Sequence, residues 1–326
     1  MNTIETHDLA KAFGAVKAVD GITMDVGKGE LFALVGPDGA GKSTTIKMLC
    51  GILTPTGGNA TVLGCDTQKD KAELVKKIGY LSQRFTLYGD LTVDENIEFF
   101  ARIHNVNDFA ARREELLDFT RMKDARSRLA DRLSGGMKQK LALACTLIHS
   151  PEIIFLDEPT TGVDPVSRRD FWKILSNLLH QGITIFMTTP YLDEAERCTR
   201  VALMNRGKLL NVDTPLNVKA KMQGKVFEIV CEPVRDAYQA IMNWTGVHEV
   251  QMYGDRLNVI LHPVGRSIQE VLDYLTKQRI EIASWRPVPP RLENVFISMM
   301  TPLEEKEEEE IKAAATEEEK ETTKRS

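Results

Sequence analysis

The nine residues Gly36-Pro-Asp-Gly-Ala-Gly-Lys-Ser-Thr44 follow a run of five apolar residues, Leu31 to Val35, and open a segment of helical character. Glycines at this spacing let successive backbone N–H groups turn toward one point, and the N-terminus of the following helix adds the positive end of its dipole. Such a loop suits the β- and γ-phosphates of a nucleotide, with the lysine on the phosphates and the hydroxyl on Mg²⁺. We therefore predict a strand, a phosphate loop and a helix in succession. The predicted phosphate-binding residues are Gly36, Pro37, Asp38, Gly39, Ala40, Gly41, Lys42, Ser43 and Thr44, with Ser43 also a ligand of Mg²⁺.

Two adjacent acids, Asp157 and Glu158, follow a second apolar run, Ile153 to Leu156. Parallel sheets bind their ligands beyond the carboxyl ends of the strands, so the carboxylate of Asp157 is expected beside the phosphate loop. We predict that Asp157 holds Mg²⁺, directly or through water. Alternatively, the two acids could serve only to keep the end of the strand in contact with water. Two adjacent acids directly after four apolar residues argue against this alternative.

A third apolar run, Ile183 to Met187, completes a pattern of buried strands separated by helical stretches. This pattern predicts an α/β fold with a mainly parallel sheet. Helical periodicity dominates between Gln83 and Ser150, for instance over Val93 to Ile103 and Asp108 to Thr120. We therefore predict a helical subdomain, at about residues 84–150, inserted into the α/β core.

Composition excludes several classes of protein. The chain has 326 residues, 42% hydrophobic and 27% charged, which is enough for one large and one small domain. No run reaches the roughly 18 to 20 apolar residues of a membrane span, and the first residues lack the features of a signal peptide, so a membrane role would require a partner. Five scattered cysteines without a Cys-x-x-Cys pair indicate neither a disulfide framework nor a zinc site, and a reducing cytosol suits them.

The net charge of −5 comes from the last residues of the chain. Residues 302–326 hold ten glutamates against four lysines and one arginine, so the rest of the chain is neutral. A neutral body argues against nucleic acid as a partner, because nucleic-acid-binding domains usually carry a basic excess. The glutamate-rich segment itself is predicted to be a disordered acidic tail.

A third motif, Leu133-Ser-Gly-Gly-Met-Lys-Gln-Lys140, lies between the phosphate loop and the acids. Together the three motifs resemble those of ATP-binding cassette (ABC) ATPases. The resemblance implies a P-loop NTPase core with an inserted helical subdomain, and ATP and Mg²⁺ as cofactors. It names Glu158 as the catalytic carboxylate that polarises the attacking water. It also names Gln83 as a sensor of the γ-phosphate and Mg²⁺, hence a catalytic and metal-site residue, and Phe13 as the aromatic on which adenine stacks.

The resemblance further implies that the signature residues Ser134, Gly135 and Gly136 serve a facing cassette. A helix predicted to start near Met137 would place its N-terminus on that cassette's nucleotide. Two ATP molecules would then lie between two cassettes in head-to-tail orientation, in a homodimer or a heterodimer. Asp164, in the turn Thr160-Thr-Gly-Val-Asp164, is expected to touch the opposite site.

The sequence departs from the family at Met187-Thr-Thr-Pro-Tyr191, where ABC ATPases present a histidine that holds the attacking water. Proline at position 190 has no polar side-chain atom and no N–H. Tyr191 and Thr189 are the available substitutes. We predict intact ATP binding and slow hydrolysis in a dimer of two identical copies.

Residues 1–222 are predicted to form the cassette, and residues 225–300 a small α+β domain. The expected β-α-β-β-α-β order places strands at 225–232, 247–252, 256–261 and 280–286, and helices at 233–244, 267–277 and 290–299, as in a split-βαβ sandwich. This arrangement, with the ending Leu292-Glu-Asn-Val-Phe296, resembles the ATP-binding subunits of bacterial exporters of the daunorubicin-resistance type.

That second resemblance implies a role as the energising subunit of an exporter. Its partners would be separate transmembrane permease subunits, and its place the cytoplasmic face of the inner (plasma) membrane. The permease would dock in a groove at Arg84 to Phe100. Two alternatives are a soluble ABC ATPase that clamps a non-transport partner and a degenerate cassette that pairs with a different, active one. The transported substrate is chosen by membrane subunits and does not follow from this sequence.

Overall fold

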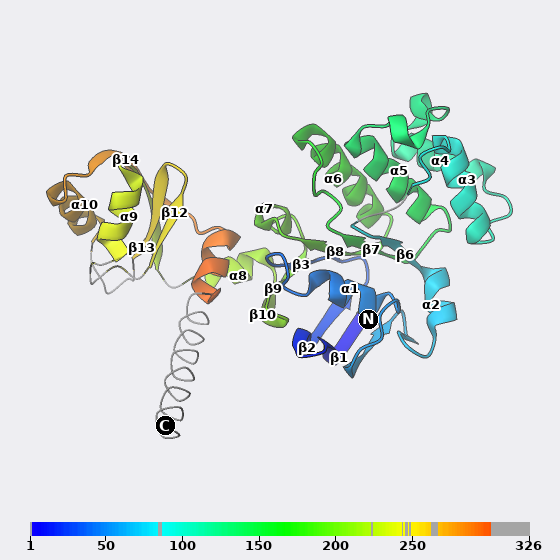
Figure 1. Cartoon of the computed structure of the whole chain (residues 1–326), viewed down its shortest axis with the longest axis horizontal. Helices are drawn as coiled ribbons and strands as arrows, with labels where there is room; N and C mark the ends of the chain where they lie inside the picture. Colours follow the sequence, from blue (N-terminus) through cyan, green and yellow to red (C-terminus); the bar gives the residue numbers. More distant parts are fainter. Residues whose placement is uncertain are drawn as a thin grey trace, which may run out of the picture. The chain divides into compact units, whose positions relative to one another are not determined.

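The computed structural model describes residues 2–83, 87–222, 224–242, 244, 247, 249–261 and 267–300. The chain divides into two compact units, Met1–Pro215 and Leu216–Ser326. The first unit contains two sheets and a group of helices, and the second contains one sheet with its own helices (Figure 1).

A six-stranded sheet forms the centre of the first unit, in the order β10-β9-β3-β8-β7-β6. Its middle strands are buried along their whole length, which explains their apolar sequences. Phe32 and Phe186 stack at 5.5 Å between ring centroids within this layer. The five parallel strands are β3 (Leu31–Val35), β6 (Ile78–Leu81), β7 (Ile153–Asp157), β8 (Thr184–Thr189) and β9 (Arg200–Asn205), and β10 (Lys208–Asp213) is the antiparallel edge.

A second, antiparallel sheet covers one face of the central sheet, with helix α1 (Lys42–Leu49) between the two (Figure 1). Ile46, Met48 and Leu49 of α1 belong to the same buried cluster as residues of both sheets. This sheet was not predicted from the sequence. Its strands are β1 (Asn2–Phe13), β2 (Val16–Gly27), β4 (Gly57–Val62) and β5 (Cys65–Asp66), in the order β2-β1-β4-β5.

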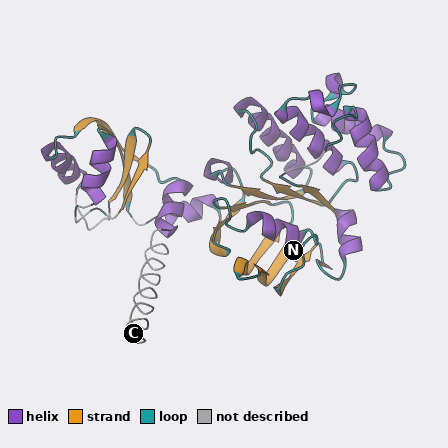
Figure 2. Ribbon diagram, viewed as in Figure 1, coloured by secondary structure: helices purple, strands orange, loops and turns teal. Residues whose placement is uncertain are grey.

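Helices cover the opposite face of the central sheet (Figure 2). The chain leaves the sheet after β6 and returns to it at β7, so the predicted insertion of a helical subdomain is confirmed. A capping box between Thr92 and Glu95 starts helix α3. The helices of this unit are α2 (Lys71–Lys77), α3 (Val93–Ile103), α4 (Ala110–Phe119), η1 (Lys123–Ala125), η2 (Ala130–Arg132), α5 (Gly135–Leu147), α6 (Pro165–His180) and α7 (Leu192–Ala195).

The second unit has the predicted β-α-β-β-α-β order, preceded by helix α8 (Pro215–Ala220). Its antiparallel sheet has the strand order β12-β13-β11-β14, and helices α9 and α10 bury one face. Ser267 and Glu270 form a capping box at the start of α10. The elements are β11 (Lys225–Glu232), α9 (Val234–Met242), β12 (Glu249–Tyr253), β13 (Arg256–Leu261), α10 (Ile268–Lys277) and β14 (Glu281–Val288).

A further helix, residues 292–300, follows β14 and supplies buried side chains to the second unit. Leu292, Val295 and Phe296 are at most 7% exposed. Asn294 donates to the side chain of Gln251 on β12 at 2.7 Å, and its carbonyl accepts from the same side chain at 3.2 Å. The Leu-Glu-Asn-Val-Phe run is therefore part of a packed core.

Among the described residues, no helix combines the length and the apolar character needed to cross a membrane. The predicted acidic tail, residues 302–326, lies outside the described residues, as does the start of the predicted groove, residues 84–86.

Candidate functional site

The predicted phosphate loop connects the end of β3 to the start of α1. Two of its glycines are required by geometry. A Cβ at Gly36 would lie 2.1 Å from the carbonyl oxygen of Met204, and Gly41 has a φ of 105° with the carbonyl oxygen of Ala18 beside it. Ala40 is buried beneath the loop. The loop therefore keeps a tight turn whose backbone approaches its neighbours too closely for side chains.

Lys42, the first residue of α1, is 3% exposed and points back along the loop. Its ammonium donates to the carbonyl oxygens of Gly36 at 2.9 Å and Pro37 at 3.0 Å. The same group lies 3.2 Å from Oε1 of Glu158. The structure thus brings together a cation and an acid from motifs that lie more than a hundred residues apart.

Asp157 ends β7 beside the start of α1, as predicted. Ser43 donates to Oδ1 of Asp157 at 2.9 Å, and Thr188 of the neighbouring strand donates to the same atom at 2.6 Å. Asp157 and Thr188 are register partners in the parallel pairing of β7 and β8. Two hydroxyls and a carboxylate therefore meet at one point, a donor set suited to a hard cation.

Glu158 has a φ of 50°, in the left-handed region that residues other than glycine rarely adopt. Its N–H donates to the hydroxyl of Thr188 at 3.0 Å, which supports this conformation. Its Oε2 accepts from Nε2 of Gln83 at 2.9 Å and from the hydroxyl of Thr161 at 3.5 Å. Backbone strain held in place by neighbours is common at functional sites.

These side chains surround a pocket of about 450 Å³. The pocket brings together predicted residues from the phosphate loop, Gln83 and Glu158, the second acid of the pair. It also includes residues that the sequence did not single out for this site, Ala18 and Thr161. The lining residues are Ala18, Asp38, Gly39, Gly41, Lys42, Ser43, Thr44, Gln83, Glu158, Thr161, Pro190 and Tyr191.

Pro190 and Tyr191 also line this pocket, whereas Thr189 is fully buried. The hydroxyl of Thr189 donates to Glu194 at 2.9 Å and accepts from the N–H of Tyr191 at 3.0 Å. Of the two substitutes considered for the missing histidine, only Tyr191 therefore faces the pocket.

Phe13 lies at the end of β1 with its side chain 52% exposed and the ammonium of Lys11 5.2 Å from the ring centre. It is not among the described residues that line the 450 Å³ pocket. An exposed ring is open to stacking, and its contact with adenine stays a prediction.

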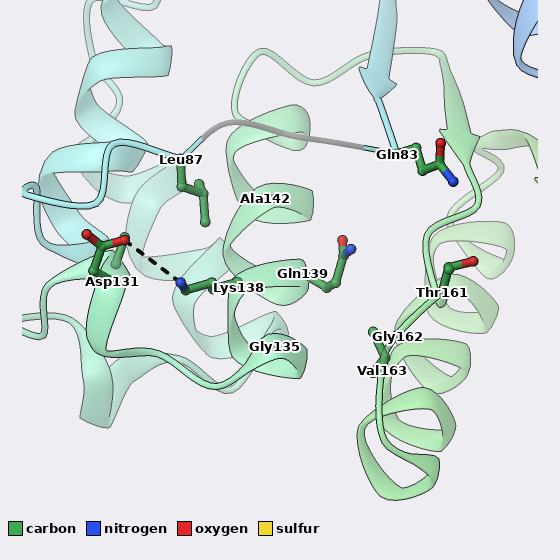
Figure 3. A pocket seen from close by; sticks show the side chains of 11 residues that line it. Gln83, Leu87, Asp131, Gly135, Lys138, Gln139, Ala142, Thr161, Gly162 and Val163 are labelled. Carbon is green, nitrogen blue, oxygen red and sulfur yellow. Dashed lines mark ion pairs between the residues drawn. The ribbon is translucent and has the colours of Figure 1, made fainter.

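The signature lies at a neighbouring pocket of about 440 Å³ (Figure 3). Gln83 and Thr161 line both pockets, and Gly135 and Gly162 line the second. Ser134 is exposed and caps α5, so the helix begins at Gly135, two residues earlier than predicted. None of the three signature residues is among the described residues that line the pocket at the phosphate loop.

Asp164 caps helix α6, where its Oδ1 accepts from the N–H groups of Val166 at 3.1 Å and Ser167 at 3.0 Å. Hydrogen bonds from Ser167 lower the pKa of Asp164 below its ordinary value. Its contact with a second cassette stays a prediction, since one chain holds half of such a site.

Two residues beneath the site remain neutral. Burial, with the charge of Asp157 nearby, raises the pKa of Tyr80 well above its ordinary value. Burial and the same carboxylate raise the pKa of Cys50. Asp157 therefore has two neutral groups near it in addition to the hydroxyls of Ser43 and Thr188, which donate to its carboxylate.

Two family models match this chain. Residues 19–161 match the family described as ABC transporter, and residues 214–300 match the C-terminal domain of DrrA1-3-like ATP-binding proteins. The probable multidrug ABC transporter ATP-binding protein YbhF of Escherichia coli (strain K12) is 45% identical over 223 residues, which are 67% of this chain. They are 38% of that protein, so the chain spans about two fifths of its length.

Another relative covers almost the whole chain. The daunorubicin/doxorubicin resistance ATP-binding protein DrrA of Streptomyces peucetius is 32% identical over 91% of this chain and 92% of its own length. Among solved structures, a dimeric bacterial ABC transporter cassette is similar with a TM-score of 0.60 and 25% identity, over 65% of this chain and 98% of that one. The chain therefore belongs to the ABC transporter ATP-binding proteins, in the group whose C-terminal domain is like that of the DrrA proteins.

Proposed function

We propose that this protein is the energising subunit of an exporter, which binds ATP with Mg²⁺ between two cassettes and hydrolyses it to drive a membrane permease. The observation that carries the proposal is the convergence of Lys42, Gln83 and Glu158 on one pocket, which Ser43 also lines while it donates a hydrogen bond to Asp157. The proposal places the protein at the cytoplasmic face of the membrane, held there by the permease.

The residues present fit Mg²⁺. Magnesium prefers oxygen ligands and is usually bound by one or two carboxylates together with substrate phosphates. Ser43 and Asp157 supply a hydroxyl and a carboxylate 2.9 Å apart, and Gln83 adds an amide oxygen at the mouth of the pocket. Within the described ranges, no group of three or more His, Cys, Asp or Glu side chains forms a competing metal site.

The chain's own residues supply the remaining chemistry. Bound Mg²⁺ would neutralise charge on the β- and γ-phosphates. Lys42 and the loop N–H groups would hold the same phosphates, and Glu158 would accept a proton from the attacking water, positioned through Gln83. Pro190 offers no polar atom at the position where the family has histidine, so we propose slow hydrolysis.

The signature supports the proposed dimer. Ser134 and Gly135 are exposed at the N-terminus of α5, which is 13 residues long and suited to binding phosphate. They lie apart from the chain's own phosphate loop, as a site completed by a second cassette requires. The similar bacterial ABC transporter cassette, whose solved structure is dimeric, supports a dimer.

An apolar pocket of about 270 Å³ supports a docking site for the permease. It is lined by Phe100, the last residue of the predicted groove, and by residues of the core, with Ile52 and Val75 at least half exposed beside it. We propose that an apolar helix of the permease inserts here. The full lining is Cys50, Ile52, Val75, Ile78, Tyr80, Phe100, His104, Cys145, Thr146 and His149.

Affinity purification from native membranes tests the proposal. We expect a permease with several apolar spans to co-elute and ATPase activity to depend on Glu158. Ile52→Asp should reduce permease recovery severalfold, whereas Leu216→Asp, the same change at a still more exposed apolar residue of the second unit, should not. Recovery of ribosomes or another soluble partner in place of a permease would favour the clamp alternative, which the transporter relatives do not support.

Pro190 favours one further candidate function. This chain would then be a degenerate cassette that pairs with a different ATP-binding chain, and that chain would carry the complete set of catalytic residues. Mass spectrometry of the purified complex distinguishes the two, because a second ATP-binding chain would identify a heterodimer.

A further inference from the structure

A buried carboxylate outside the phosphate pocket has every oxygen partnered. Glu194, on the short helix α7, is 1% exposed. Its Oε1 accepts from the hydroxyl of Thr160 at 2.7 Å and from Nη2 and Nε of Arg168 at 2.6 and 3.1 Å. Its Oε2 accepts from the hydroxyl of Thr189 at 2.9 Å. We call Glu194, Arg168, Thr160 and Thr189 the Glu194 cluster.

The Glu194 cluster joins two segments that border the phosphate pocket to helix α6, which carries Arg168. Thr160 precedes Thr161, whose hydroxyl contacts Glu158, and Thr189 precedes Pro190 and Tyr191 in the pocket wall. The guanidinium of Arg168 lies 4.8 Å from the centre of the Tyr191 ring. Because buried, fully satisfied networks hold their members in one geometry, these segments have little freedom to move separately.

The same cluster reaches the signature through helix α6. Arg168 lies in the first two turns of α6, which Asp164 caps. The starts of α5 and α6 are in close contact, since a Cβ at Gly136 would lie 2.3 Å from the hydroxyl oxygen of Ser167. A shift of the start of α6 would therefore displace Gly136 and the signature with it.

We propose that Glu194 is a positioning residue that connects, within one chain, the residues at its own ATP with the signature that it presents to the ATP of the facing cassette. The inference rests on the proposed function. A displacement of Pro190 and Tyr191 in the pocket wall is transmitted through Thr189, Glu194 and Arg168 to helices α6 and α5. The phosphate pocket and the signature therefore move together. Thr160 extends the connection to the segment beside Glu158.

The test compares Glu194→Gln with Glu196→Gln, the same chemical change at an exposed position two residues further along this segment. Glutamine removes the charge opposite Arg168 and directs an amide N–H₂ at one of the two threonines. We expect Glu194→Gln to lower the single-turnover hydrolysis rate about tenfold. We also expect it to weaken ATP-dependent dimerisation by a similar factor, and this dimerisation is measured in a Glu158→Gln background, where ATP is not consumed. Its affinity for ATP should stay within about twofold of the parent, as in a coupling defect.

A second pair of variants separates positioning from folding. Thr160→Val removes a single hydrogen bond and should slow hydrolysis, whereas Thr160→Ser keeps the hydroxyl and should restore most of the rate. If Glu194→Gln does not fold, this pair decides the question. Equal rates and equal dimerisation in all four variants, even with a lowered Tm, would show that the cluster is structural only. Absence of ATP-dependent dimerisation and hydrolysis in the unmodified protein would instead contradict the proposed function.

Discussion

Pro190 is the residue to which we attribute the proposed slow hydrolysis. It lines the phosphate pocket between Thr189, whose hydroxyl donates a hydrogen bond to Glu194, and Tyr191, which also lines the pocket. A histidine at this position would place an imidazole near the γ-phosphate of bound ATP, where it could form a hydrogen bond with the attacking water. We expect Pro190→His to raise single-turnover hydrolysis about 10²-fold, the lower end of the range for a positioned polar group.

Pro190→Ala is the control for this substitution, because it removes the ring and restores an N–H without adding imidazole. We expect it to stay near the parent rate. A parent protein that already turns over several times per second, or equal rates for the alanine and histidine variants, would contradict the role given to this position.

Most of the site could be predicted because its residues occur in contiguous motifs. Lys42, Ser43, Asp157 and Glu158 are recognisable from the order of residue types and from the apolar strands that precede them. Thr188 and Glu194 were missed for a physical reason. Thr188 meets Asp157 only through the register of two parallel strands, and Glu194 has three partners at sequence separations from 5 to 34.

At the scale of elements, prediction succeeded where the hydrophobic pattern was strong. The strands and helices of the second unit alternate with clear periods, and their predicted bounds differ from the observed ones by one to two residues at most ends. The antiparallel sheet of the first unit was missed. Its strand β1 contains polar residues, Thr, Glu, His and Lys, and its pairing with β2 has several register shifts, so no simple alternation marks it.

The helix at residues 292–300 gives a prediction about stability. Phe296 is 7% exposed and packs in the second unit, so Phe296→Ala leaves a cavity. We expect a loss of about 3 kcal/mol or more in the free energy of unfolding. Glu293→Ala, at an exposed position of the same helix, is the control and should be nearly neutral. Urea unfolding followed by tryptophan fluorescence measures both, and equal midpoints would show that this helix adds little to the core.

Helices α3 and α5 give a prediction about pH. His104, at the end of α3, stacks on His149 beyond α5 with ring centres 3.9 Å apart. Burial, and then the neighbouring His149, lower the pKa of His104 to about 4. Burial also lowers the pKa of His149. The unfolded chain therefore binds protons near the ordinary histidine value of about 6.5 while the folded chain does not.

Stability should consequently fall as the pH drops from about 6.5 toward 4, and be unaffected by this pair above that range. His104→Leu removes one of the two groups, so we expect its unfolding free energy to depend less steeply on pH in this range. His180→Leu, at an exposed histidine, is the control. Identical slopes for His104→Leu and the parent would contradict the assignment.

At the scale of the whole molecule, the phosphate pocket and the signature lie on different parts of one chain, and we propose that each is half of a site. Head-to-tail pairing then makes a specific prediction about mixtures of defective variants. Lys42→Ala removes the phosphate contact, and Gly135→Asp places a charge at the N-terminus of α5, so either variant alone should show no hydrolysis. A mixed dimer, however, contains one site with an intact phosphate pocket from the signature variant and an intact signature from the lysine variant.

We therefore expect hydrolysis to return, at part of the parent rate, when Lys42→Ala and Gly135→Asp are combined and dimerised with ATP. Mixing Lys42→Ala with Glu158→Gln is the matched control, since both defects lie on the phosphate side and every mixed dimer still has two defective sites. Activity in the first mixture and none in the second would follow only from sites shared between chains. If neither mixture recovers activity although mixed dimers form, each chain would supply its own signature, contrary to the separation of the phosphate pocket and the signature in this fold.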